Sequence, residues 1–475
     1  MELSPTLNRA PKTIHHIHLM GICGTGMASL AGMLKEKGYL VSGSDQNVYP
    51  PMSHFLETLS IPVLKGYNAC NLSPKPDLVI VGNVITRDNS EALELSRLRL
   101  PYLSLPQALK HFALGHKRSI VISGTHGKTT TSAVVAWILE IAGIKPGFMI
   151  GGIPHNFQRN FQQGEGPYFV IEGDEYDTAF FDKRPKFLHY SPWATILTSI
   201  EFDHADIYRN LAHVRESFKK LIQLIPPEGI LIANIDDPIV AMEIENARCP
   251  VATYALYENG MWKAVDISSE NKLTHFTVLK GGHHHMTLHT SMFGRHNIAN
   301  LLSAVILADF LKIPSAVVSE GMKYFSGIRR RQEEVGEKRG VLVLDDFAHH
   351  PTSVHETIRA VREKHRNRRL IAVFEPRSNS SRRNIFQERY ALSFDQADLT
   401  MIPEPPMMEK IPETERFSSR RLVKDLNKHD LQAFYFPETD LLLEALLKEA
   451  KTGDVVLIMS NGGFDNLPTR LLERL

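Results

Sequence analysis

The stretch Gly124-Thr125-His126-Gly127-Lys128-Thr129-Thr130 decides the fold of the middle of this 475-residue chain. It follows the apolar run Ser119–Ser123, which is typical of a buried strand, and leads into the apolar helical pattern Thr129–Ile141. Glycines in such a turn let backbone N–H groups face a phosphate, and the helix N-terminus adds partial positive charge. Lys128 would neutralise the outer phosphates, and Thr129 would place its hydroxyl on Mg²⁺. The pattern therefore favours a nucleotide-binding α/β domain.

The generic phosphate-loop pattern has a glycine at the position that Ile122 occupies here, so the strict match fails. The alternative is a strand–turn–helix junction in which the glycines are only structural. The Gly-Lys-Thr tail in this context favours nucleotide binding.

Strand and helix patterns alternate on both sides of this segment. Ile17–Met20 reads as a strand, followed by a glycine-punctuated turn and a helix that stops at Gly38. Leu273–Leu288 alternates around Gly281-Gly282 and predicts a hairpin. In the last third, strands are predicted at Val341–Leu344, Leu370–Phe374, Leu399–Ile402 and Val455–Met459. We predict three α/β domains at 1–115, 116–326 and 327–475, the outer two Rossmann-like and the middle one P-loop ATPase-like.

Composition excludes several classes of protein. The chain has 54 basic and 53 acidic residues, so it lacks the basic excess of a nucleic-acid or anionic-membrane binder. Three cysteines without a CxxC pair fit neither a disulfide framework nor a zinc knuckle. The polar N-terminus and the lack of eighteen consecutive apolar residues predict a cytoplasmic protein without stable membrane association.

Two acidic segments follow predicted strands. Glu172–Asp177 comes after Tyr168–Ile171, and Glu201–Asp206 comes after Ala194–Ile200. Ligands of α/β sheets bind at the carboxyl ends of strands, and Mg²⁺ prefers oxygen donors. Each segment alone is more typical of a solvated acidic turn. The run His283–His285 is not expected to chelate one ion, since adjacent residues of a hairpin point to opposite faces, and a solvated loop is favoured.

The turn Gly21–Met27 resembles a dinucleotide fingerprint, but Cys23 and Ser29 stand where glycines belong. Asp45 follows the next strand, where an acidic residue could reach a ribose hydroxyl. This turn alone leaves a nicotinamide oxidoreductase as one alternative, which would leave Gly124–Thr130 unexplained. A non-catalytic, nucleotide-gated binding protein is another.

The chain resembles the Mur ligases over essentially its whole length. These enzymes and the folylpolyglutamate synthetases share a shortened loop, Gly-Thr-x-Gly-Lys-Thr-[Ser/Thr], which Gly124–Thr130 matches in full. The resemblance implies a three-domain, ATP- and Mg²⁺-dependent ligase that forms a carbon–nitrogen bond. It also implies a first domain that binds the uridine diphosphate of a sugar nucleotide rather than NAD.

The resemblance implies roles for particular residues. It assigns ATP to Gly124, Thr125, His126, Gly127, Lys128, Thr129, Thr130, Asn297, Arg331 and Asp346. It assigns metal ions to Thr129, Glu172 and His204, and catalysis to Lys128, His204 and Arg331. It implies that the UDP-sugar is bound by Gly21, Gly24, Gly26 and Asp45. It implies that an incoming peptide is bound by His349, His350, Arg377 and Asn379.

Further blocks are similar to the branch of the family that recycles murein tripeptide: Asp45–Ser53, Tyr176–Lys186, Glu201–Tyr208, Asp345–Thr352, Glu375–Asn379 and Ser460–Asp465. The implied reaction joins UDP-N-acetylmuramate to L-alanyl-γ-D-glutamyl-meso-diaminopimelate through an acyl phosphate, in peptidoglycan recycling. The alternative is UDP-N-acetylmuramate–L-alanine ligase, which has Gln-Pro-His-Arg in place of Glu375–Ser378.

Overall fold

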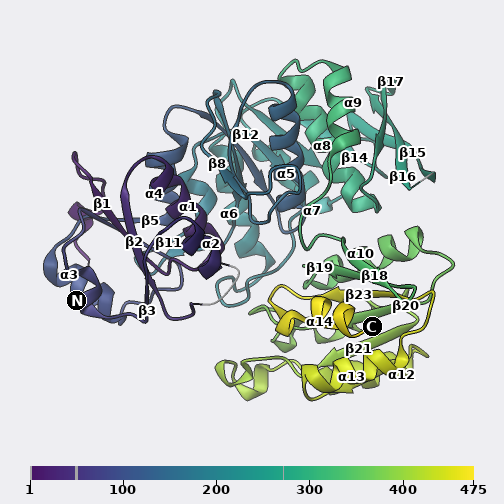
Figure 1. Cartoon of the computed structure of the whole chain (residues 1–475). Helices are drawn as coiled ribbons and strands as arrows, with labels where there is room; N and C mark the ends of the chain where they lie inside the picture. The colour runs from purple at the N-terminus through teal and green to yellow at the C-terminus, as the bar shows by residue number, and fades with distance from the viewer. Residues whose placement is uncertain (1–2, 49–51, 271) are drawn as a thin grey trace.

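The computed structural model describes residues 3–48, 52–270 and 272–475, which form three α/β domains in chain order (Figure 1). The segment 49–51, within the block Asp45–Ser53, lies outside the described residues. The first domain holds a five-stranded parallel sheet of order β3-β2-β1-β4-β5. Its elements include β1 (His16–Met20), α1 (Thr25–Glu36), β2 (Leu40–Asp45), β3 (Val63–Lys65), β4 (Leu78–Val81), α3 (Ser90–Leu98), β5 (Tyr102–Ser104) and α4 (Leu105–Leu109). Successive strands joined by helices make the doubly wound pattern that the sequence predicts.

The central domain is built on a ten-stranded sheet of order β17-β16-β15-β14-β13-β12-β6-β9-β7-β8. Its parallel middle includes β6 (Arg118–Ser123), β9 (Tyr168–Gly173), β12 (Pro192–Leu197), β13 (Ile230–Asn234) and β14 (Val251–Ala255). The edge strands β7 (Gly147–Met149) and β8 (Phe161–Gln162) extend it on one side. Helices α5 (Lys128–Ile141), α8 (Arg295–Phe310) and α9 (Ser315–Tyr324) pack together beside it.

The predicted hairpin is confirmed as β16 (Leu273–Lys280) and β17 (His283–Thr290), joined by Gly281 and Gly282. Both glycines have positive φ, +56° and +80°, which the tight turn requires. A third strand, β15 (Trp262–Glu270), adds to the hairpin and was not predicted. The run His283–His285 therefore begins a strand, and its expected placement in a loop is wrong.

The C-terminal domain carries a six-stranded sheet of order β18-β19-β23-β20-β21-β22, antiparallel only at β18. Its strands are β18 (Glu333–Lys338), β19 (Val341–Asp346), β20 (Leu370–Phe374), β21 (Leu399–Pro403), β22 (Ala433–Phe436) and β23 (Val455–Met459). Its helices include α10 (Pro351–Lys364), α12 (Ser419–Lys428), α13 (Thr439–Glu449) and α14 (Leu467–Arg474). The predicted α/β class with three domains is confirmed.

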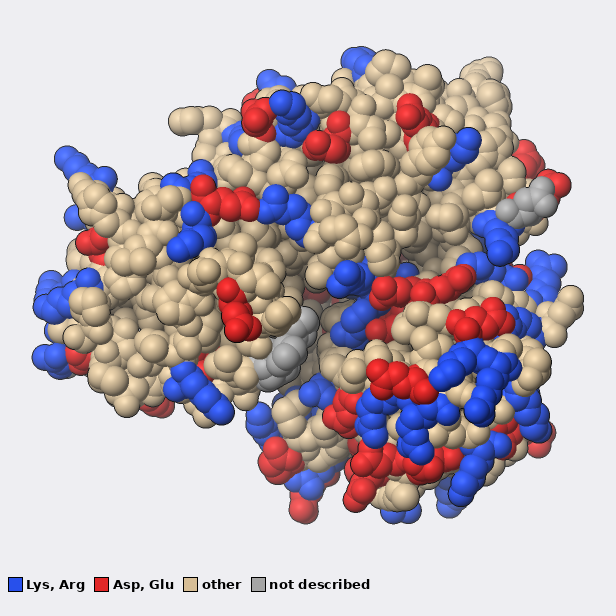
Figure 2. All heavy atoms as spheres, viewed as in Figure 1, with Lys and Arg blue, Asp and Glu red and all other residues tan. Residues whose placement is uncertain are grey.

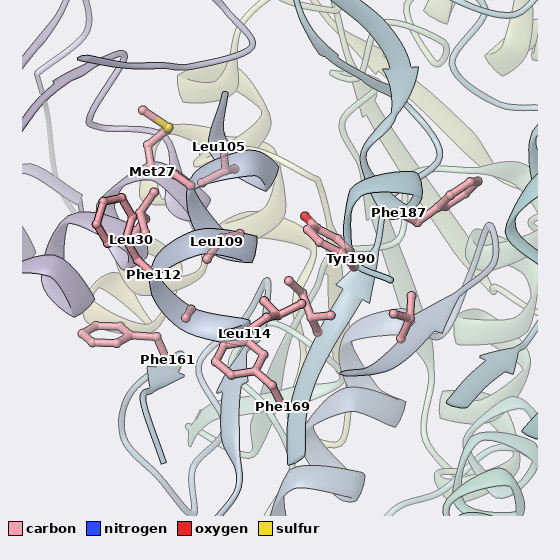
Figure 3. Close-up of a cluster of buried hydrophobic side chains, with 14 of the residues drawn as sticks. Met27, Leu30, Leu105, Leu109, Phe112, Leu114, Phe161, Phe169, Phe187 and Tyr190 are labelled. Carbon is pink, nitrogen blue, oxygen red and sulfur yellow. The ribbon is translucent and has the colours of Figure 1, made fainter. Parts of the chain in front are cut away.

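An apolar seam joins the first two domains (Figure 3). Leu30 of α1 and Leu109 of α4 belong to one buried cluster with Phe161 of β8 and Phe169 of β9. Phe161 reaches so close to α1 that a Cβ on Gly32 would lie 2.6 Å from its ring. The two domains therefore share a continuous hydrophobic core, which binds them as one body.

The C-terminal domain meets the central domain differently. Figure 2 shows many charged side chains on this domain, at the lower right, with a hollow between it and the rest of the molecule. Many of its contacts with the central domain are hydrogen bonds and ion pairs, and Phe202 and Phe293 add an apolar patch. A mainly polar interface of this kind is typical of domains that move relative to one another. Within the described residues, no helix has the length and apolar character needed to cross a membrane.

Candidate functional site

Three neighbouring parallel strands bring the predicted site together. β9 and β12 flank β6 on either side, so the segments that follow these strands meet at one edge of the sheet. These segments are the loop 124–130, the acidic block 172–177, whose first two residues end β9, and the block 201–206. Their convergence at the carboxyl ends of parallel strands is the usual place for a ligand in an α/β sheet.

The glycines of the loop are required by close packing. Gly124 has φ of +131°, and a Cβ there would lie 2.2 Å from Oγ1 of Thr198. Gly127 has φ of +80°, and a Cβ there would lie 2.4 Å from Oδ1 of Asn300. α5 begins at Lys128, directly after Gly127. The loop thus turns tightly into a helix N-terminus, the geometry that receives a phosphate group.

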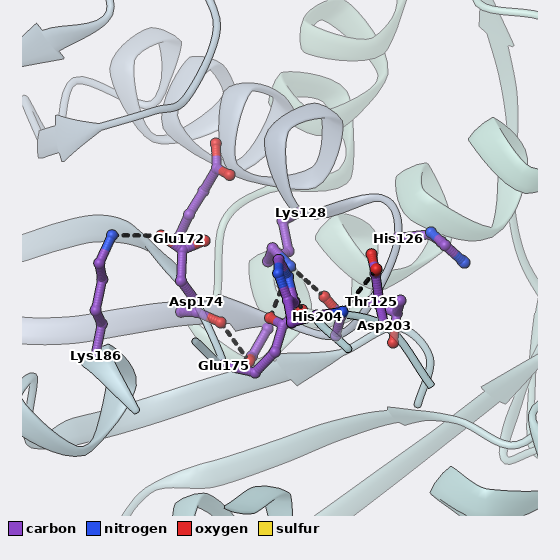
Figure 4. Close-up of polar contacts among 12 residues, drawn as sticks. Thr125, His126, Lys128, Glu172, Asp174, Glu175, Lys186, Asp203 and His204 are labelled. Carbon is purple, nitrogen blue, oxygen red and sulfur yellow. Dashed lines mark hydrogen bonds and ion pairs between the residues drawn. The ribbon is translucent and has the colours of Figure 1, made fainter. Parts of the chain in front are cut away.

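Lys128 is held against a buried carboxylate (Figure 4). Its Nζ donates to Oε2 of Glu175 at 2.9 Å and to the Gly124 carbonyl at 2.6 Å. On the other side, Oε1 of Glu175 lies 3.2 Å from Nε2 of His204. Burial acts to raise the pKa of Glu175, but Lys128 and His204 outweigh it and lower that pKa to about 2. Burial acts to lower the pKa of His204, but the contact with Glu175 outweighs it and raises that pKa to about 9.

A second cluster lies on the other side of the loop. The Thr129 hydroxyl donates to Oε2 of Glu172 at 3.2 Å and accepts from Nη2 of Arg331 at 3.2 Å. Burial, followed by the charge of Asp174, raises the pKa of Glu172. A hydroxyl and a carboxylate at hydrogen-bond distance beside a phosphate loop form the donor set that suits Mg²⁺. Arg331 reaches this cluster from the junction with the C-terminal domain.

The residues predicted to contact ATP outside the loop are linked through Gln332. Oδ2 of Asp346 accepts from the Gln332 N–H at 2.7 Å, and Nδ2 of Asn297 donates to Oε1 of Gln332 at 2.9 Å. Asp346 and Asn297 are both buried. Asp346 ends β19 and Asn297 lies in the first turn of α8, so this chain of contacts connects the central and C-terminal domains. The structure thus brings Asn297, Arg331 and Asp346 beside one another.

The residues predicted to hold a UDP-sugar form a separate cluster in the first domain. Gly21 turns the chain with φ of +80°, and its N–H donates to the Ser44 carbonyl. Asp45, at the end of β2, accepts from the Cys23 N–H at 2.9 Å through Oδ2. The carboxylate of Asp45 therefore orients the turn that precedes α1. Gly24 and Gly26 flank the N-terminus of that helix.

The residues predicted to receive a peptide lie in two loops of the C-terminal domain. Asn379, after β20, donates to Oδ2 of Asp206 in the central domain at 3.0 Å, and Nη1 of Arg377 donates to Oε1 of Glu375 at 3.2 Å. His349 is half-buried before α10. His350 is buried and faces the loop, with ring centroids of His350 and His126 4.7 Å apart.

Sequence reasoning missed several members of the site. Glu175 lies in the quoted acidic block, but only Glu172 was assigned from it. Glu201 accepts from Arg389 at 2.8 Å and lies 3.1 Å from Nε2 of His126. A signal for Glu175 was present in the Glu172-x-x-Glu175 spacing after the strand. Arg389 carries no comparable signal, because it lies 188 residues from Glu201 in the chain.

Comparisons with known proteins agree with this architecture. The description Mur ligase family, catalytic domain, matches residues 16–117; Mur ligase middle domain matches 122–308; and Mur ligase, glutamate ligase domain, matches 330–462. UDP-N-acetylmuramate–L-alanyl-γ-D-glutamyl-meso-2,6-diaminoheptandioate ligase of Escherichia coli is 40% identical, with 97% of this chain and 98% of the relative covered. UDP-N-acetylmuramate–L-alanine ligase of Clostridium acetobutylicum is 33% identical, over 94% and 95%. The crystal structure of a murein peptide ligase from Psychrobacter arcticus has a TM-score of 0.74 at 34% identity, covering 97% of this chain and 98% of that one.

A phosphate loop in the middle of three α/β domains, with an acidic cluster beside it, defines a nucleotide-binding enzyme, and the matched relatives are ligases. The matches cover all three domains. The chain belongs to the Mur ligase family.

Proposed function

We propose that this chain is an ATP- and Mg²⁺-dependent ligase that joins UDP-N-acetylmuramate to the tripeptide L-alanyl-γ-D-glutamyl-meso-diaminopimelate. The similarity to the Escherichia coli ligase of that name, at 40% identity over almost the full length of both chains, carries the proposal. The geometry supports it, because Lys128, Thr129, Glu172 and His204 converge at one sheet edge. The proposed role is in peptidoglycan recycling, and substrates of this kind imply a cytoplasmic enzyme.

Each domain has a proposed ligand. Gly21, Gly24, Gly26 and Asp45 would hold the UDP-sugar, and the loop 124–130 with Asn297, Arg331 and Asp346 would hold ATP. Thr129, Glu172 and His204 would hold the metal ions, which would neutralise phosphate charge. His349, His350, Arg377 and Asn379 would form the peptide side of the site. The ATP set spans two domains, because Arg331 and Asp346 belong to the C-terminal part of the chain and Asn297 to the central domain.

The reaction requires activation of a carboxylate, since a carboxylate and an amine do not condense to a useful extent in water. The sugar carboxylate attacks the γ-phosphorus of ATP. ADP departs, and the carboxylate becomes an acyl phosphate. The amine of the peptide then attacks the acyl carbon and loses a proton, and phosphate leaves as the amide forms. Lys128 and Arg331 would stabilise the negative charge on the transferring phosphoryl group. Glu175 would keep Lys128 charged and aimed into the loop, given their 2.9 Å contact.

Phosphate release tests this function. Purified protein is mixed with Mg·ATP and UDP-N-acetylmuramate, and release is compared with tripeptide, with L-alanine and with no amine. Release with the tripeptide alone is expected. Release with L-alanine but not with tripeptide would assign the chain the activity of UDP-N-acetylmuramate–L-alanine ligase. Release with neither amine would overturn the proposed substrates. Lys128→Met serves as the control for contaminating ATPases, because it removes the charge that the proposed chemistry requires.

A further inference from the structure

Two imidazoles and one carboxylate converge between the nucleotide loop and the C-terminal domain. His126 belongs to the loop, Glu201 follows β12, and His350 precedes α10 as its N-cap. One possible ligand atom from each of these three residues lies within 4.8 Å of the others. This cluster shares no residue with Thr129, Glu172 and His204, to which the proposed function assigns the magnesium ions; it includes His126 from the proposed ATP loop and His350 from the proposed peptide side, so an ion here would lie between those two parts of the site. We propose that His126, Glu201 and His350 form a binding site for a Zn²⁺-like transition-metal ion that joins the C-terminal domain to the loop.

The donor atoms decide the class of ion. Mg²⁺ prefers an all-oxygen shell and keeps several waters. Two imidazole nitrogens with one carboxylate oxygen suit Zn²⁺, Co²⁺ or Fe²⁺, and three protein ligands leave a position for water. The site therefore discriminates against the ion that the proposed reaction uses.

Further contacts orient the three side chains. Nε2 of His126 lies 3.1 Å from Oε1 of Glu201, and Nδ1 of His126 lies 3.0 Å from the hydroxyl of Ser353. The second oxygen of Glu201 accepts from Thr352 at 2.9 Å and from Arg389 at 2.8 Å. Hydrogen bonds to the atoms that do not coordinate fix metal ligands in this way.

The imidazole of His350 is the least tightly held of the three. Its Nδ1 accepts from the Thr352 N–H at 3.3 Å, and its Nε2 lies 3.3 Å from the Phe202 carbonyl. Both contacts are long, so coordination of an ion would replace weak interactions with a stronger bond. His350 lies in the C-terminal domain and the other two ligands in the central domain. An ion would therefore bind only while the domains are in contact, and it would stabilise that contact.

Crystals of the whole protein soaked in Zn²⁺ alone, without nucleotide or substrate, test the site directly. An anomalous difference peak at the zinc edge is expected between His126, Glu201 and His350. A peak confined to Glu172 and His204, or to the cross-strand pair His275 and His289, would overturn the proposal. His275 and His289 could also bind Zn²⁺, because their Nδ1 atoms lie 2.6 Å apart. Failure of this test leaves the proposed ligase reaction untouched, since no substrate is involved.

Cobalt absorption tests the site in solution. Co²⁺ alone is titrated into the wild-type protein, and the visible bands of low-coordinate cobalt are followed. Glu201→Gln and His350→Asn are each expected to weaken Co²⁺ binding at least tenfold, and His275→Asn to leave it unchanged. Unchanged binding in correctly folded Glu201→Gln, or its loss in His275→Asn, would contradict the proposal. Circular dichroism checks the fold of each variant, and the wild-type crystal result does not depend on them.

Discussion

The ammonium of Lys128 and the carboxylate of Glu175 lie 2.9 Å apart in the interior of the central domain. Glu175 is almost fully buried, and its other oxygen faces His204. The lysine of the phosphate loop is thus paired by the protein itself. Because of this pairing, mutation of Lys128 and Glu175 can distinguish the effect on phosphate release from the effect on the free energy of unfolding.

Lys128→Met is expected to reduce phosphate release by about 100-fold, because it removes charge stabilisation from the transferring group. It also leaves Glu175 without its lysine, at a cost of about 3 kcal/mol in the free energy of unfolding. The double variant Lys128→Met/Glu175→Gln should recover much of that stability and none of the activity. Urea unfolding and phosphate release measure the two effects. Equal stability of the single and double variants would contradict the role of the pair.

The pH dependence of stability should reveal the contact between His204 and Glu175. The folded pKa of His204 is about 9, above the ordinary value of 6.5. Stability from its charged form is therefore fully present below pH 6.5 and is lost as the pH rises through about 9. Urea unfolding of the metal-free protein between pH 6 and 10 should show this decline. His204→Asn should flatten it, and an unchanged slope in that variant would assign the decline to another group.

Gly127→Ala and Gly143→Ala form a matched pair. Both glycines have positive φ, +80° and +71°, but a Cβ on Gly143 would meet no atom within 4 Å, whereas one on Gly127 would meet Asn300. Gly143→Ala should cost about 1 kcal/mol, the strain of the backbone alone. Gly127→Ala should cost more, because its methyl group would collide with that side chain, and it should also weaken ATP binding. Thermal unfolding and nucleotide titration compare the two variants, and equal effects would mean that packing against Asn300 contributes nothing.

Leu109→Ala tests the apolar seam between the first two domains. Leu109 is fully buried there, so the cavity should lower the free energy of unfolding by about 3 kcal/mol. Leu392→Ala is the control, since Leu392 is 70% exposed and should change stability little. Calorimetry should show the loss in the unfolding of the first two domains together. A loss confined to one of them would contradict a shared core.

Arg377→Ala tests the proposed peptide side of the site. It should raise the KM for tripeptide about tenfold, the effect of one charged hydrogen bond, and leave the KM for ATP unchanged. Arg421→Ala is the control, because Arg421 is an exposed arginine of the same domain. Steady-state kinetics measure both variants. An unchanged KM for tripeptide would remove Arg377 from the peptide site.

Much of the fold could be predicted from local patterns. Ser119–Ser123, the glycine turn and Thr129–Ile141 correspond to β6, the loop and α5, because apolar periodicity and glycine act over a few residues. β15 was not predicted, because its far half, Asp266 to Glu270, is mostly polar and largely exposed. The site was harder to predict. Glu175 meets Lys128 only because β9 and β6 pair in one register, and a single sequence does not reveal that register.

The apolar seam of Figure 3 has a consequence for how precisely the ligands must be placed. Domains that share a core are expected to behave as one rigid frame, which would hold the turn at Gly21 and the loop at Lys128 at a fixed separation. The C-terminal domain, held mainly by polar contacts, is the adjustable part. In the proposed reaction, the frame would fix the place of the activated carboxylate, and the C-terminal domain would adjust to the incoming amine.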